Sequence, residues 1–260
     1  QIWDLVNYVQ TLSPSQKPKT PEIFNVQKID GQLSDDPDDP IWKTVDSNFY
    51  PLAGQIIQAE KTIYPIVDHV VVKAMHNGKD IAFYLHWDDP TVDPILKKST
   101  TVEESPAPPL PAHLQIDEPE EQPTEELKPQ EFPDSIAIQL PASINDGNEQ
   151  PYFLNGDSEH PVNLWKWSSH PMKALELNAT GIEKINVQKD SSQNLTSKAS
   201  FKYGRYFLVV KRPLTTSDAK VDIQLRSGQT IPIAFNIWNG SAGETGSKKV
   251  ISSWFDMILE

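Results

Sequence analysis

Two strand-like runs joined by an Asn-Gly dipeptide constrain the fold of this chain more than any other stretch. Val70 to His76 and Asp80 to Trp87 are rich in β-branched and aromatic residues. Asn77-Gly78 lies between them, and this dipeptide tolerates the positive φ angles that a tight hairpin turn requires. Large apolar side chains occupy every second position of the later run: Ile81, Phe83, Leu85 and Trp87. The stretch therefore predicts an antiparallel hairpin with one face in the core.

Short strand-like runs recur through the rest of the chain, separated by clusters of Gly, Pro, Asn and Ser. These runs are residues 135–140, 161–167, 182–188, 205–212, 221–225, 231–238 and 252–259. No helical periodicity lies between them. Such spacing predicts an all-β fold, an antiparallel β-sandwich of the immunoglobulin-like or DOMON-like kind with a few short helices.

Two segments depart from the strand pattern. Apolar residues recur at helical spacing in residues 1–13, and residues 14–28 are predicted to be a polar linker that leads into a sandwich domain over 29–260. Within that domain, residues 98–132 form an acidic, Pro-rich insertion. Eight prolines between Pro106 and Pro133 interrupt a Glu-rich tract, which cannot bury enough apolar surface to offset its ordering entropy. We therefore predict that the insertion is an excursion from the sandwich.

The composition excludes several classes of function. The formal net charge of -13 disfavours nucleic acid and anionic membrane surfaces as partners, because both would repel the chain. The absence of cysteine rules out disulfides, thiolate catalysis, iron–sulfur clusters and covalently attached haem within these residues. No apolar run is long enough for a transmembrane helix. The first residue is Gln rather than Met, so we expect a processed or missing beginning.

Soft and nitrogen ligands near bulky aromatic residues are the remaining candidates for chemistry. The sequence shows no phosphate loop, nucleophile elbow or paired metal-binding histidines. Haem needs a dry, apolar slot with a ligand on each face. Met75 at the end of a predicted strand is one candidate ligand, and Lys166, His170 and Met172 beside Trp165 and Trp167 are others. The residues alone also allow an interpretation without haem. In it Met75 fills a gap in the core, and Trp165 and Trp167 are ordinary core residues.

Several phrases of the sequence together resemble a known family. They are residues 73–78, 81–91, 132–141, 161–167 (ending Trp-Lys-Trp), 206–214 and 231–240, with Trp254 near the end. In this order they resemble the haem-b subunit, or γ subunit, of type II DMSO reductase family enzymes such as ethylbenzene dehydrogenase and nitrite oxidoreductase. The resemblance covers roughly residues 29 to 259.

The resemblance implies a β-sandwich that holds one non-covalent haem b through a methionine and a lysine. Met75 matches the methionine. The family's lysine normally follows the second tryptophan of the Trp-x-Trp phrase, and Ser168 stands there in this chain. Lys166 and His170 are therefore alternatives for the second axial ligand of the iron. A domain without haem is a further alternative.

The same resemblance implies an electron-transfer subunit with no substrate of its own. Its partners would be a catalytic subunit with a molybdenum cofactor, an iron–sulfur subunit and a c-type cytochrome, in an extracytoplasmic compartment such as the periplasm. Residues 2–12 resemble the last helix of a class I cytochrome c domain, which implies haem c upstream of Gln1, as in nitrite oxidoreductase-like members.

Two other functions are consistent with the sequence. Asp30-Gly-Gln-Leu33 followed by Pro40-Ile-Trp-Lys43 resembles the opening of family-nine carbohydrate-binding sandwiches. An extracellular carbohydrate-binding module is therefore the second hypothesis. The third is a structural subunit of the same complex that has no haem.

Overall fold

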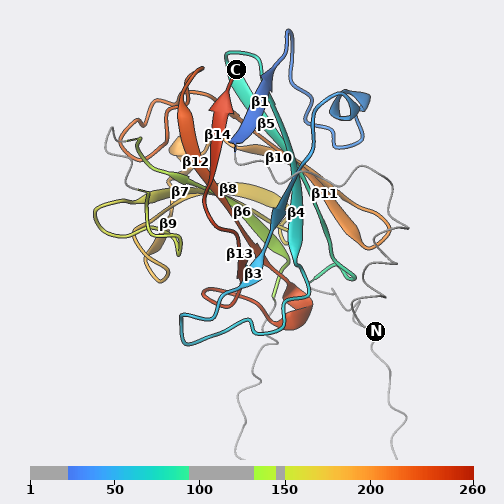
Figure 1. Cartoon of the computed structure of the whole chain (residues 1–260), viewed down its shortest axis with the longest axis vertical. Helices are drawn as coiled ribbons and strands as arrows, with labels where there is room; N and C mark the ends of the chain where they lie inside the picture. Colours follow the sequence, from blue (N-terminus) through green and yellow to red (C-terminus); the bar gives the residue numbers. More distant parts are fainter. Residues whose placement is uncertain (1–22, 94–131, 145–149) are drawn as a thin grey trace, which may run out of the picture.

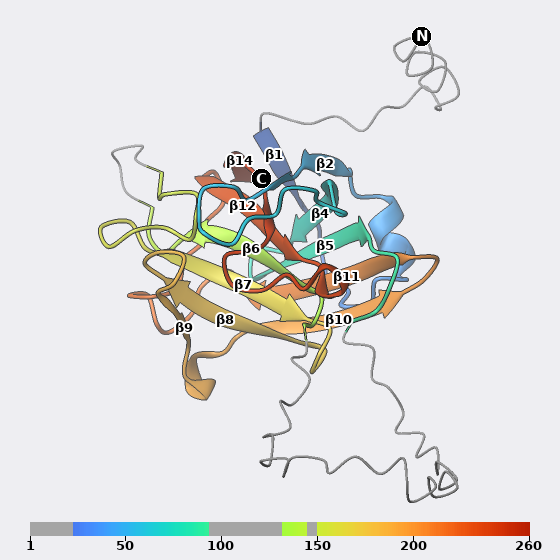
Figure 2. The same cartoon turned by 90° about the horizontal axis from the view of Figure 1, so that it is seen from below.

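The computed structural model describes residues 23–93, 132–144 and 150–260, and these fold into a β-sandwich (Figures 1 and 2). The strands are β1 (Ile23–Lys28), β2 (Asn48–Pro51), β3 (Ala53–Gly54), β4 (His69–His76), β5 (Asp80–Asp88), β6 (Ser135–Pro141), β7 (Val162–Ser168), β8 (Lys173–Ala179), β9 (Ile185–Val187), β10 (Thr196–Phe201), β11 (Arg205–Pro213), β12 (Thr230–Trp238), β13 (Val250–Ile251) and β14 (Phe255–Leu259). Short 3-10 turns are η1 (Pro40–Lys43), η3 (Asp190–Ser192) and η4 (Gly240–Ala242). The predicted tail over 1–13 and most of the acidic insertion lie outside the described residues.

The strands form two layers, and hydrogen bonds between neighbouring strands join these layers into one continuous sheet. One layer contains β10, β11, β5, β4 and β2, and the other contains β12, β6, β7, β8 and β9. β1 and β14 lie between β4 and β12 and so link the two layers, and β13 pairs with β12 and β3. Among the described residues no helix is long and apolar enough to cross a membrane.

The predicted sandwich is confirmed, but its strands are not all antiparallel. β1 pairs in parallel with both β4 and β14, whereas the other pairs of described strands are antiparallel. A parallel pair needs a long crossover connection, and about forty residues of chain separate β1 from β4. β1 also lies within residues 14–28, so the sandwich includes the last part of the segment predicted as linker.

The predicted hairpin forms as β4 and β5, with Met75 opposite Ala82 and His76 opposite Ile81. Gly78 has a φ of 84°, which a residue without Cβ adopts at little cost. The Asn77 side chain accepts hydrogen bonds from the backbone N–H groups of Lys79 and Asp80. This turn therefore fixes the register of the two central strands.

The main core lies between the two layers and is built from alternate residues of every central strand. Its largest members include Phe83, Trp87, Trp165, Trp167 and Tyr206, all with almost no exposed surface. Since Trp165 and Trp167 face this core, the residue between them faces the opposite side of β7. The alternation therefore directs Lys166 away from the core.

Candidate functional site

Met75 belongs to a second apolar cluster, on the outer side of the β4–β5–β11 layer. The cluster joins residues of these strands to the segment between β1 and β2, and its buried members are Leu33, Trp42, Val45, Met75, Ala82, Tyr84 and Val209. The Met75 side chain is fully buried. Lys73 donates a hydrogen bond from Nζ to the Trp42 carbonyl oxygen, at 2.5 Å, which secures η1 over the strands. The thioether is therefore packed as a core side chain would be.

Lys166 lies on the outer side of the other layer, beside Trp238 of β12. Its Nζ is 4.4 Å from the centroid of the Trp238 ring system. Burial lowers the pKa of the Lys166 amine, because the charged form loses hydration there. The contact with the Trp238 ring acts in the other direction, because an aromatic face attracts the charged amine.

A second lysine approaches the same tryptophan. The Nζ of Lys249 is 5.1 Å from the Trp238 centroid and donates a hydrogen bond to Asn155 Oδ1 at 2.8 Å. The Lys249 side chain is fully buried, and burial together with the charge of Lys166 lowers its pKa to about 7. Sequence analysis missed Lys249, Trp238 and Asn155, since a Lys-Lys pair before a short strand is typical of a solvated turn. Only the fold shows that one of these lysines is enclosed.

His170 lies in the turn between β7 and β8. Its side chain is exposed, and its carbonyl oxygen accepts a hydrogen bond from Ser168 Oγ at 3.0 Å. Met172 in the same turn is 60% exposed. The Ser169 backbone N–H donates to the Asp134 carbonyl oxygen, which ties the turn to the start of β6. His170 is therefore at the same end of the sandwich as Asp93 and Phe132, the two described residues on either side of a gap in the description.

The structure does not bring the three predicted ligands together. Met75 and Lys166 lie on outward faces of different layers, with the main core between them. Lys166 and His170 belong to the same layer, but no hydrogen bond or ring contact joins them in the described structure. In this arrangement Met75 and Lys166 do not face a common site.

A group of buried carboxylates occupies the same end of the sandwich as His170. Asp134 accepts hydrogen bonds from Tyr206 Oη at 2.8 Å, from the Asp93 N–H at 2.7 Å and from the Gly240 N–H at 2.8 Å. Asp89 is fully buried, and its Oδ2 has no hydrogen-bond partner. Burial, reinforced by the charge of Asp134, raises the pKa of Asp89 to about 7.

These carboxylates do not form a metal site. Among the described residues, no cluster of three or more His, Cys, Asp or Glu side chains has the geometry to hold a metal ion. Sequence analysis did not single them out, because Asp88-Asp89 and Asp134 read as residues at strand ends. The contacts of Asp134 join the start of β6 to β11 and η4.

Comparison with known proteins gives a family match and a fold match. A family model described as "Ethylbenzene dehydrogenase" matches residues 39–181 and 176–250. A Haloferax mediterranei protein named "Putative respiratory nitrate reductase heme subunit ORF7" is 30% identical over 127 residues, which are 49% of this chain and 44% of that protein. The "Dimethylsulfide dehydrogenase subunit gamma" of Rhodovulum sulfidophilum is 26% identical over 132 residues, 46% of this chain and 45% of that protein. The matches thus span less than half the length of these relatives.

The fold is also similar to that of a solved structure. A "putative carbohydrate-binding protein" from Bacteroides uniformis superposes with a TM-score of 0.50 at 10% identity, over 92% of this chain and 99% of that one. At this identity the likeness concerns the β-sandwich alone.

Proposed function

Because this chain belongs to the ethylbenzene dehydrogenase family, we propose that it is a haem-carrying electron-transfer subunit of a larger oxidoreductase. In this proposal it has no substrate of its own. Its partners are a catalytic subunit with a molybdenum cofactor, an iron–sulfur subunit and a c-type cytochrome, in an extracytoplasmic compartment. The relatives named as a heme subunit and as a gamma subunit support the assignment. Since the chain has no cysteine, the haem that we propose is non-covalent haem b.

The placement of Lys166 is the structural observation that supports the proposal most directly. Burial lowers the pKa of this amine, which favours the uncharged form that a metal ligand requires, and its Nζ lies 4.4 Å from the Trp238 ring centroid. When bound, haem supplies a one-electron carrier whose potential depends on its axial ligands and on its burial. Trp238 contacts the half-buried Lys166 side chain, and Lys249 places a second amine at the same indole.

We propose Lys166 as one axial ligand, with His170 as the alternative. Lys166 is already oriented by β7, since its strand neighbours are fixed in the core. His170 is in an exposed turn and would have to fold back over the sheet. Met75 would have to leave the cluster around Trp42 to reach the same iron as Lys166.

The test is the visible spectrum of the full-length protein, before and after reduction with dithionite, with a pyridine haemochrome assay for haem type. We expect a Soret band that shifts on reduction. Lys166→Leu should alter the position of this band or abolish haem binding, and Lys173→Leu is the matched control, because Lys173 is an exposed lysine on the neighbouring strand. If Lys166→Leu and Lys173→Leu both leave the spectrum unchanged while His170→Ala alters it, His170 replaces Lys166 in the proposal.

A colourless full-length protein would remove the haem assignment and leave the two other functions. A colourless protein that copurifies with a molybdoenzyme would favour the structural subunit, and one that binds glycans would favour the carbohydrate module. The similarity to a solved carbohydrate-binding protein concerns the fold alone. Among the described residues the tryptophans are buried or partly buried, so none forms an open stacking platform; they are Trp42, Trp87, Trp165, Trp167, Trp238 and Trp254.

A further inference from the structure

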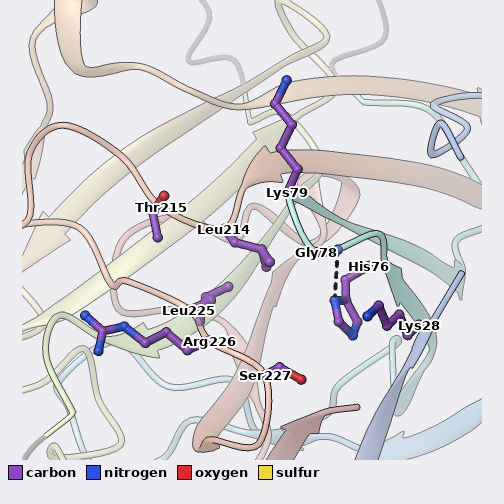
Figure 3. A pocket seen from close by; sticks show the side chains of 9 residues that line it. All are labelled: Lys28, His76, Gly78, Lys79, Leu214, Thr215, Leu225, Arg226 and Ser227. Carbon is purple, nitrogen blue, oxygen red and sulfur yellow. Dashed lines mark hydrogen bonds between the residues drawn. The ribbon is translucent and has the colours of Figure 1, made fainter. Parts of the chain in front are cut away.

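A pocket opens at the end of the sandwich where β1 and the β4–β5 turn meet the segments that flank β11 and β12. Its volume is about 390 Å3, within the range of small-molecule sites. Its lining residues are Lys28, His76, Gly78, Lys79, Leu214, Thr215, Leu225, Arg226 and Ser227 (Figure 3). The lining includes three cationic side chains and no carboxylate, in a chain whose formal net charge is -13. The side chains that line the pocket therefore carry positive charge, although the negative charge of Glu260 also acts on His76.

Backbone pairing fixes the walls of this pocket. The parallel register of β1 and β4 places Lys28 beside His76. On the opposite wall the Leu214 N–H donates to the Lys79 carbonyl oxygen at 2.8 Å, and the Leu225 N–H donates to the Leu214 carbonyl oxygen at 2.9 Å. The pocket is thus a feature of the sheet ends, and its shape does not depend on side-chain rotamers alone.

His76 contributes a buried hydrogen-bond donor. The Gly78 backbone N–H donates to His76 Nδ1 at 3.3 Å, so the neutral ring has its proton on Nε2. Nε2 is buried and makes no direct hydrogen bond. Burial lowers the pKa of His76, whereas the backbone and the negative charge of Glu260 act to raise it, so Glu260 lies close to the ring. An acceptor oxygen of a ligand would complete the hydrogen bonding of this buried donor.

The polar and apolar parts of the pocket lie on different sides. Figure 3 shows the Lys28 amine close to the His76 ring, whereas the charged ends of Lys79 and Arg226 turn outward. Leu214 and Leu225, both almost fully buried, point across the pocket toward His76. A ligand that matches this arrangement has an acid group at one end and an apolar body at the other.

We propose that this pocket binds a small organic anion, whose acid group lies between the Lys28 amine and His76 Nε2 and whose apolar part contacts Leu214 and Leu225. The site is distinct from the surroundings of Lys166 and does not depend on haem. It would let a small organic acid bind to this subunit beside the Met75-to-His76 end of β4.

The experiment is isothermal titration calorimetry of the full-length protein with three probes: hexanoate, hexanamide and acetate. Hexanoate has both an acid group and an apolar chain, hexanamide keeps the chain without the charge, and acetate keeps the charge without the chain. We expect saturable binding of hexanoate at one site, with hexanamide and acetate each weaker by about tenfold or more.

Variants locate the site. Lys28→Met should weaken hexanoate binding by about fivefold or more, because Lys28 is an exposed residue whose loss removes the nearest charge. Lys189→Met, an exposed lysine far along the chain, removes the same charge elsewhere and should bind as the original protein does. His76→Phe keeps a ring but loses the donor, and should also bind more weakly if a thermal melt shows that it folds.

Four results would overturn the proposal. The first is no saturable hexanoate binding by the unmodified protein, and the second is equal affinity for hexanoate and hexanamide. The third is unchanged affinity in Lys28→Met. The fourth is an equal loss in Lys28→Met and Lys189→Met, which would indicate an effect of overall charge. Equal affinity for acetate and hexanoate would remove Leu214 and Leu225 from the site.

Discussion

Arg212 of β11 and Glu176 of β8 form an ion pair that crosses the core between the two layers. The Nη1–Oε2 distance is 2.9 Å, and neither side chain has any exposed surface. Arg212 also donates to the Ile223 carbonyl oxygen and stacks on Trp165, with 4.6 Å from its Cζ to the ring centroid. This single side chain therefore connects both layers through polar contacts inside the sandwich.

Glu176→Gln should destabilise the protein by about 3 kcal/mol or more, because the change leaves a buried guanidinium without its counter-charge. Urea denaturation followed by tryptophan fluorescence measures this loss. The matched control is Asp38→Asn, which breaks an exposed pair between Asp38 and Lys202 and should cost less than about 1 kcal/mol. Equal effects of the two substitutions would show that the buried pair contributes no more than a surface pair.

Asp89 should make the protein less stable as the pH rises. Burial, then the charge of Asp134, raises its pKa in the folded protein to about 7 from 3.8. The folded state therefore binds a proton that the unfolded state has released, and the resulting stabilisation, complete below about pH 4, is lost as the pH rises through 7. We expect the free energy of unfolding to fall by about 2 kcal/mol between pH 5 and pH 8.

The comparison for this prediction is Asp89→Asn, which removes the titrating group and retains an acceptor for the Thr91 N–H. Its free energy of unfolding should change less between pH 5 and pH 8 than that of the unmodified protein. Asp190→Asn, at an exposed site in η3, should leave the slope unchanged. A slope in Asp89→Asn as steep as in the unmodified protein would assign the pH dependence to other groups.

Gly240 should be intolerant of any side chain. A Cβ at this position would overlap the Phe132 carbonyl oxygen and Cβ of Asp93. Because those atoms belong to backbone and to a buried residue, Gly240→Ala should cost about 3 kcal/mol. Gly181→Ala is the control: it has open space around it but a φ of 140°, so it should cost about 1 kcal/mol. Thermal denaturation of both variants tests whether the close approach matters more than the backbone angle.

The sequence predicted the central strands well because they are continuous apolar or alternating runs. β4, β5, β6, β7, β11 and β12 all coincide with predicted strands. β8 and β10 were missed, since Lys173–Ala179 lacks β-branched residues and Thr196–Phe201 is mostly polar. Their strand conformation comes from pairing with β7 and β11 rather than from local preference. Residues 221–225 were predicted as a strand, but they pair with no neighbouring strand, although Ile223 and Leu225 are buried.

The candidate site was less predictable because it depends on contacts between distant segments. The two-residue period showed that Lys166 faces away from Trp165 and Trp167, but nothing in the sequence indicated that Trp238 would cover it. The enclosure of Lys249 requires Asn155, β13 and β12 to meet. The family resemblance that selected Met75, carried by residues 73–78 and the other matching phrases, likewise contained no information on which side of the sandwich Met75 would occupy.

Substitutions of Met75 test whether this methionine serves to pack the core or to bind the haem iron. Its side chain is fully buried in the cluster with Trp42 and Tyr84, on the opposite side of the core from Lys166. Met75→Leu preserves volume and should cost less than about 1.5 kcal/mol, whereas Met75→Ala leaves a cavity and should cost about 2 to 5 kcal/mol.

The same pair of variants separates stability from haem binding. Leucine has no lone pair, so replacing an axial sulfur would shift the Soret band and lower the reduction potential. From the packing we expect Met75→Leu to keep the spectrum and the midpoint potential of the unmodified protein, measured by redox titration. A changed potential in Met75→Leu, with its unfolding free energy preserved, would show that Met75 reaches the iron and that the segment around Trp42 moves when haem binds.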